Sequence, residues 1–376
     1  MEGIPPRRST GRRTWLRPAG PPPTIRDRRA CRRSEELIRM ADASKPLERG
    51  AYNVDPDRLV PFDERDTIFA RMHWDRSASF FEHEYRTGAR ERIEAGEVGY
   101  SRVDFARVLA SWTVHDCFGG AFSWRRLGEA DPALMKLGPH PVEDRELMST
   151  QVKETARMFG ADLVGIAPID KRWIYSHDRS GDSVDVPSGH KYAIVMAVAM
   201  DGEVVSTSPA YASAAATGVG YSRMAFAIAS MAQFLRNLRY NAIPMGNDTA
   251  LSIPLAIDAG LGQLGRNGLL VTPEFGPCVR LCKVFTDLPL APDGPRDFGL
   301  SDTCRSCTRC AEACEGEAIS TSREPSFGTV CPSNRPGVER WAVHADRCYD
   351  FWIRNTAACS NCIAACPFTA GARTSS

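Results

Sequence analysis

The chain has 376 residues, 43% of them hydrophobic, which is enough for about two globular domains with a sizeable core. Lysine plus arginine number 47 and aspartate plus glutamate 46, a balance that argues against a dedicated nucleic-acid-binding protein. No run of about 18 apolar residues occurs, so we expect no membrane-spanning helix.

Arginines and prolines dominate residues 1–45. Residues 1–33 carry a net charge of +8, which leaves −7 on the rest because the whole chain carries +1. This tail offers little to bury, so we expect it to be disordered. Residues 11–17 resemble a twin-arginine export motif, but prolines follow where an apolar stretch is required. A disordered tail, with Met40 as a competing start, is preferred over a signal, and a cytoplasmic location over export.

Residues 46–140 show little periodicity apart from a helix expected over 102–112, and we interpret them as a support region. From residue 141 the hydrophobic pattern becomes regular. Helices are predicted over 141–159, 212–238 and 251–259, and strands over 161–167, 191–200, 269–272 and 279–286, with an extended piece at 241–245. Such alternation predicts an α/β or α+β core spanning residues 141–298.

Cysteines concentrate in the last part of the chain, residues 299–376. Nine of the thirteen lie there, and seven of these form a Cys-x2-Cys-x2-Cys-x3-Cys run and a Cys-x2-Cys-x3-Cys-Pro run. Thiolates at the first spacing wrap a [4Fe-4S] cluster, and in two-cluster ferredoxins the fourth cysteine of a run binds the other cluster. This region is therefore predicted to be a ferredoxin-like domain with two [4Fe-4S] clusters. Paired cysteines also bind structural zinc, but that site prefers two separated pairs.

The exchange of the fourth cysteine predicts the ligands of each cluster. The first cluster is assigned Cys304, Cys307, Cys310 and Cys366. The second is assigned Cys314, Cys359, Cys362 and a fourth ligand from outside the motifs. We select Cys348, eleven residues before Cys359, and keep Cys331 as a weaker candidate.

Residues 259–276, AGLGQLGRNGLLVTPEFG, together with 284–290 and the first cysteine run, resemble the corrinoid-dependent reductive dehalogenases. The resemblance covers roughly residues 55–368. It implies a cobalamin-binding, nitroreductase-like core followed by the ferredoxin-like domain. The implied reaction is removal of halide from an aryl or alkenyl organohalide, with electrons from a low-potential donor such as ferredoxin, flavodoxin or a reductase.

The resemblance also implies three catalytic residues, Tyr221, Asn247 and Arg280. Reductive cleavage of a carbon–halogen bond needs two electrons and one proton, and a tyrosine can donate that proton when a cation lowers its pKa. An arginine can also attract the leaving halide, and an asparagine can orient the phenol. The structural alternatives are a tyrosine bonded to backbone, a turn asparagine and an arginine in a salt bridge.

The glycine-rich segment is a second implied site. Its glycines permit close backbone approach to a large cofactor, so we expect corrinoid contacts there. The residues are Gly260, Gly262, Gly265, Arg266, Asn267 and Gly268. The segment does not match a dinucleotide-binding fingerprint, because the element before it is predicted to be a helix.

Two alternative functions stay open from the sequence. Epoxyqueuosine reductase shares the cobalamin core and the two clusters but acts on tRNA, for which an acidic body is poorly suited. The other alternative is a non-catalytic corrinoid or electron carrier, which has no use for a proton donor beside an anion site.

Overall fold

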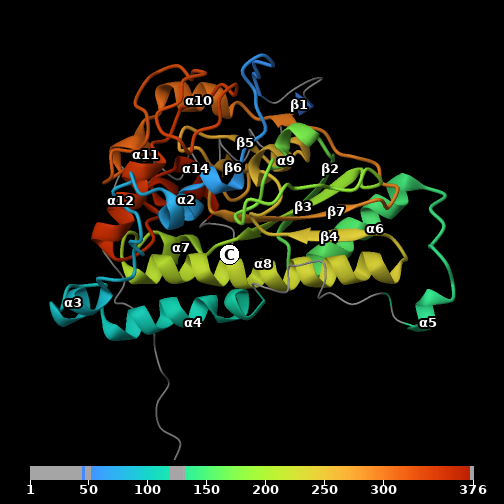
Figure 1. The fold of residues 1–376 in the computed structure, drawn as a ribbon, viewed down its shortest axis with the longest axis horizontal. Coiled ribbons are helices and arrows are strands. Elements are labelled where there is room, and N and C mark those ends of the chain that lie inside the picture. The colour runs from blue at the N-terminus through green and yellow to red at the C-terminus, as the bar shows by residue number, and fades with distance from the viewer. Residues whose placement is uncertain (1–44, 47–51, 119–129, 131, 373–376) are drawn as a thin grey trace, which may run out of the picture.

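A computed structural model describes residues 45–46, 52–118, 130 and 132–372 (Figure 1). The predicted disordered tail and the export-like motif lie outside the described residues, apart from residue 45. Among the described helices, none has the length and apolar composition that crossing a membrane demands.

A four-stranded sheet forms the centre of the fold. Its order is β2 (Leu163–Pro168), β3 (Tyr192–Ala199), β7 (Val279–Thr286) and β4 (Ala242–Met245), with every neighbouring pair antiparallel. This sheet confirms the strands predicted over 161–167, 191–200 and 279–286 and the extended piece at 241–245, and the antiparallel pairing makes the core α+β. The strand predicted over 269–272 is shorter and pairs with residues 263–264 outside this sheet. Pro244 is tolerated because β4 is an edge strand, where a missing N–H costs no ladder bond.

The two faces of the sheet belong to different cores. Ile194 and Met196 pack beneath helices α6 (Arg145–Met158) and α8 (Tyr211–Asn237). Ala193 and Val195 face α9 (Ser252–Asp258) instead. This alternation follows the two-residue period of a strand, and burial of both faces explains why β3 is almost entirely apolar.

The predicted helices are confirmed, with shifts at their ends. Helix α6 begins four residues later than expected because the Asp144 side chain accepts hydrogen bonds from the backbone N–H groups of Glu146 and Leu147. Helix α8 runs unbroken through Gly218 and Gly220.

Helix α4 (Arg102–Phe118) lies along α8 and forms an outer layer, as Figure 1 shows. It extends six residues beyond the predicted helix. A Cβ atom on Gly218 would lie 2.0 Å from the Ser111 Oγ and 2.7 Å from the Trp112 ring. Ser222 Oγ donates a 2.6 Å hydrogen bond to the Ser111 carbonyl. Gly218 is therefore needed for the close approach of the two helices.

The remaining elements surround this core. Residues before it form β1 (Lys45–Pro46), η1 (Glu64–Asp66), α2 (Ile68–Trp74), α3 (Ala89–Glu94) and α5 (Pro132–Met135). Within it lie η2 (Lys171–Trp173), α7 (Gly202–Val205), β5 (Gln263–Leu264), β6 (Leu270–Val271) and β8 (Arg296–Asp297). The cysteine-rich part carries α10 (Leu300–Ser306), α11 (Arg309–Glu312), α12 (Ala345–Asn355), α13 (Asn361–Ala364) and α14 (Pro367–Ala372), gathered at one end of the sheet (Figure 1).

Candidate active site and iron–sulfur ligands

The structure brings together the three predicted catalytic residues, Tyr221, Asn247 and Arg280, although 59 positions separate the first from the last in the sequence. Asn247 Nδ2 donates a 2.7 Å hydrogen bond to the Tyr221 hydroxyl. The Arg280 guanidinium carbon lies 5.2 Å from the centroid of the Tyr221 ring. Tyr221 comes from α8, Asn247 from the turn after β4, and Arg280 from β7. The predicted trio therefore forms a single polar group.

The orientation of Arg280 depends on α8. Its guanidinium donates a 2.9 Å hydrogen bond to the Thr217 Oγ1, one turn before Tyr221, and Nε contacts the Met200 sulfur at 3.3 Å. A Cβ on Gly220 would lie 2.9 Å from the Arg280 Cγ. Gly220 thus leaves the space through which the arginine passes along the helix.

A buried lysine supports the turn that carries Asn247. Lys283 on β7 is fully buried, and its Nζ donates to the carbonyls of Gly246 and Asp248 at 2.7 and 3.2 Å. Burial lowers the pKa of Lys283 to about 8, and the carboxylate of Asp248 partly opposes this. Lys283 was not among the residues predicted from the sequence, and the signal that could have found it is a lysine in the middle of a largely apolar predicted strand.

Two aromatic side chains of α4 cover the ring of Tyr221. The Trp112 ring stacks on it with centroids 4.9 Å apart and planes at 25°, and the His115 ring meets it edge-on at 5.3 Å. Neither residue was predicted. Their spacing of three residues places both side chains on one face of a helix. The local sequence does not predict which other element that face packs against.

The four cysteines predicted for the first cluster line one cavity. Cys304 lies in α10 and Cys307 directly after it, Cys310 lies in α11, and Cys366 directly precedes α14. Burial raises the pKa of the Cys366 thiol to about 12, and the neighbouring Cys304 and Cys310 raise it further. Bound iron would instead hold these sulfurs as thiolates.

Cys348 lies with the cysteines predicted for the second cluster. Burial raises the pKa of its thiol to about 12, with further contributions from Cys314 and Cys359. The pKa of the Cys362 thiol is also raised by burial, and further by Cys348, Cys359, Cys310 and Cys314. Helix α12 thus brings Cys348 to the second group, whereas Cys331 lies beside His344 and Asp346.

The glycine-rich segment makes contacts within its own chain. Arg266 is 1% exposed, and its guanidinium donates to the carbonyls of Cys304, Cys307, Ser320 and Ser322 while lying 4.9 Å from the centroid of Trp341. A Cβ on Gly262 would lie 2.3 Å from the Val271 carbonyl oxygen. These contacts account for the residue types, so the corrinoid contacts of this segment stay a prediction.

Replacing Arg266 by methionine should destabilise the first cysteine group. The substitution removes a donor from these partly buried carbonyls, at about 1–3 kcal/mol for each one left unpaired, so we expect a loss of about 3 kcal/mol in the free energy of unfolding and reduced iron content. Denaturant unfolding and iron analysis measure both quantities. The matched control is Arg309→Met at an exposed position. Equal stability and iron content in the two variants would remove Arg266 from this role.

Comparison with known proteins concerns the family and the fold of the chain. A family profile described as reductive dehalogenase subunit matches residues 168–290, and one described as 4Fe-4S dicluster domain matches residues 303–370. A tetrachloroethene reductive dehalogenase of Desulfitobacterium hafniense is 42% identical over 81% of this chain and 68% of its own length. The chain belongs to the reductive dehalogenase family. A second reductive dehalogenase, from Sulfurospirillum multivorans, is 33% identical over 74% of this chain and 64% of its own length.

Solved structures of reductive dehalogenases show the same fold. A catabolic reductive dehalogenase in complex with 3-bromo-4-hydroxybenzoic acid matches with a TM-score of 0.65 at 23% identity, over 90% of this chain and 47% of that one. The chain therefore spans about two thirds of the Desulfitobacterium relative and about half of the solved protein. The predicted family, fold class and iron–sulfur domain are confirmed.

The similarity to epoxyqueuosine reductase is partial. The enzyme from Lactococcus garvieae is 40% identical over 21% of this chain, against 81% for the Desulfitobacterium reductive dehalogenase. The predicted alternative of an epoxyqueuosine reductase is therefore not favoured.

Proposed function

We propose that this protein reductively removes halide from an aryl or alkenyl halide, with Tyr221 as the proton donor. The reaction consumes two electrons and one proton: the carbon–halogen bond breaks, a carbon–hydrogen bond forms, and halide leaves. The observation that carries this proposal is the hydrogen bond from Asn247 to the Tyr221 hydroxyl, with Arg280 over the same ring.

Each member of the trio has a distinct task in this proposal. The hydrogen bond from Asn247 uses a lone pair of the Tyr221 oxygen, so the O–H bond is the one available for donation to substrate. Once the proton has left, the same Asn247 N–H and the Arg280 cation stabilise the phenolate. Arg280 also offers a positive charge to the departing halide. Asn247 is exposed, which gives the substrate an approach to this group.

The family implies a corrinoid, which supplies low-potential electrons to the carbon–halogen bond when bound. The feature that fits it is the combination of proton donor and cation in one place, since an electron carrier needs neither. Contacts from residues 260–268 to the corrinoid remain a prediction, because the structure explains that segment by packing within the chain.

Two [4Fe-4S] clusters are proposed as the electron path. The grouping of the cysteines into two sets of four supports this number, since each set matches the predicted exchange of ligands between the two runs. A low-potential ferredoxin, flavodoxin or reductase is the proposed donor. A cytoplasmic location stays a prediction.

A halide-release assay tests the proposed function. The chain is reconstituted anaerobically with iron, sulfide and cobalamin, then given a low-potential reductant and a panel that includes tetrachloroethene and 3-bromo-4-hydroxybenzoate. We expect chloride or bromide release that depends on cobalamin, measured by ion chromatography. Full cofactor loading without halide release from any substrate would favour the carrier alternative.

A further inference from the structure

Three metal-ligating side chains meet outside the two cysteine groups. One ligand atom each from Cys331, His344 and Asp346 lies within 4.8 Å of the other two. Each of the three side chains is partly buried. Cys331 is the cysteine that the second iron–sulfur group does not take up, so its presence here calls for a separate explanation.

The histidine supplies an atom without a protein partner. His344 Nδ1 is buried, and among the described residues it has no hydrogen-bond partner. A buried polar atom left unpaired costs about 1–3 kcal/mol. The Cys331 sulfur has only a weak contact, at 3.9 Å, to the Val343 carbonyl. The Cys331 sulfur and one imidazole nitrogen of His344 are therefore without a strong hydrogen bond in the described part of the chain.

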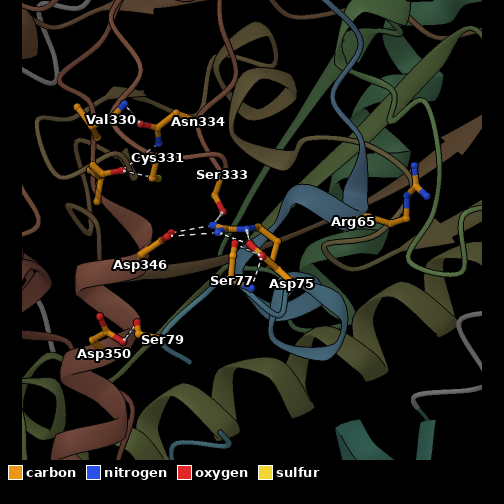
Figure 2. A network of polar contacts seen from close by, with 12 residues as sticks. Arg65, Asp75, Ser77, Ser79, Val330, Cys331, Ser333, Asn334, Asp346 and Asp350 are labelled. Carbon is orange, nitrogen blue, oxygen red and sulfur yellow. Dashed lines mark hydrogen bonds and ion pairs between the residues drawn. The ribbon is translucent and has the colours of Figure 1, made fainter. Parts of the chain in front are cut away.

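The carboxylate is held in place from outside the trio. Arg71, 3% exposed, donates to Asp346 at 2.7 Å and to Asp75 at 2.7 Å, and its Nη1 also contacts Ser333 at 3.2 Å (Figure 2). A carboxylate that pairs with an arginine keeps free lone pairs for a second ligand. Such outer partners orient the ligands of metal sites.

The loop around Cys331 is also fixed. Asn334 accepts a hydrogen bond from the Val330 N–H at 2.9 Å and donates one to the Val343 carbonyl at 2.9 Å, which ties the two sides of the loop together (Figure 2). Cys331 and His344 therefore face each other without needing metal to draw the loop closed, and a preorganised site binds with less loss of entropy.

We propose that Cys331, His344 and Asp346 bind a zinc ion, with water as the fourth ligand. One thiolate, one imidazole and one carboxylate are donors that zinc accepts in tetrahedral geometry, whereas magnesium and calcium prefer oxygen alone. The two anionic ligands balance the charge of the ion. The zinc ion would join the loop to the first turn of α12, two residues before Cys348, and so support the helix that carries that cysteine.

Metal analysis and zinc-edge X-ray absorption test the site on the anaerobically reconstituted protein after zinc loading and a chelator wash. We expect about one zinc per chain, with one sulfur at about 2.3 Å and lighter ligands at about 2.0–2.2 Å. Cys331→Ser and His344→Ala should each lose this zinc. Ser333→Ala, in the same loop but outside the trio, should keep it.

The iron content provides the internal control. It should be equal in the wild type and all three variants, which shows that each variant folds and loads its clusters. Zinc retained by both ligand variants, zinc bound by four sulfurs, iron in place of zinc, or no bound metal would each overturn the proposal. The zinc content does not depend on dehalogenation, so the metal analysis tests this site even if the halide-release assay gives a negative result.

Discussion

Tyr221→Phe is expected to slow halide release by about 10²- to 10⁴-fold while corrinoid and iron contents stay unchanged. Loss of a general acid typically has an effect of this size, well beyond that of one lost hydroxyl contact in a pocket. The phenylalanine ring retains the stacking on Trp112 and the contact with Arg280, so the packing around position 221 is preserved. Steady-state halide release by cofactor-loaded protein measures the effect.

Tyr240→Phe is the matched control. Its hydroxyl donates to the His140 carbonyl, away from the trio, so this variant should lose about 1 kcal/mol of stability at most and no activity. Arg280→Lys should also be damaging, because lysine keeps the charge but loses the planar fork that reaches Thr217 and the tyrosine ring together. Wild-type rates for Tyr221→Phe across brominated and chlorinated substrates would place the proton donor elsewhere.

Cys348→Ser is expected to lower the iron content from about eight to about four per chain, because one [4Fe-4S] cluster loses a ligand. Cys348 is partly buried beside Cys314, Cys359 and Cys362, and a serine hydroxyl is a poor replacement for a thiolate on iron. Iron and sulfide analysis, with low-temperature paramagnetic resonance of the reduced protein, distinguishes one remaining cluster from two.

Cys331→Ser is the comparison variant, and it should keep both clusters. The two substitutions make the same chemical change, one in the loop before α12 and one in the first turn of α12, so a general effect of replacing a cysteine by serine would appear in both. If Cys331→Ser loses a cluster while Cys348→Ser keeps two, the fourth ligand is Cys331 and the assignment is reversed.

Local patterns were sufficient for most elements of the core. An apolar run such as residues 192–199 is compatible with a strand buried on both faces, and the structure confirms it as β3. The pairing of the strands could not be predicted, because the hydrophobic periodicity of a strand indicates which of its faces are buried and not which strands lie beside it. The antiparallel order β2-β3-β7-β4, and hence an α+β core, is a property of the assembled sheet.

The sequence by itself determined the iron–sulfur domain, because cysteine spacing limits directly which sulfurs can surround one cluster. Together with the family resemblance it also pointed to Tyr221, Asn247 and Arg280. Only the tertiary structure decided what surrounds them: Trp112 and His115 over the tyrosine, and Lys283 beneath the Asn247 turn. The tertiary structure also places Cys348 beside Cys314 and Cys359, and Cys331 beside His344 and Asp346. It directs the Arg266 guanidinium to the carbonyl of Cys307. These contacts join segments far apart in the chain, and their partners are set by the packing of whole elements rather than by any local pattern.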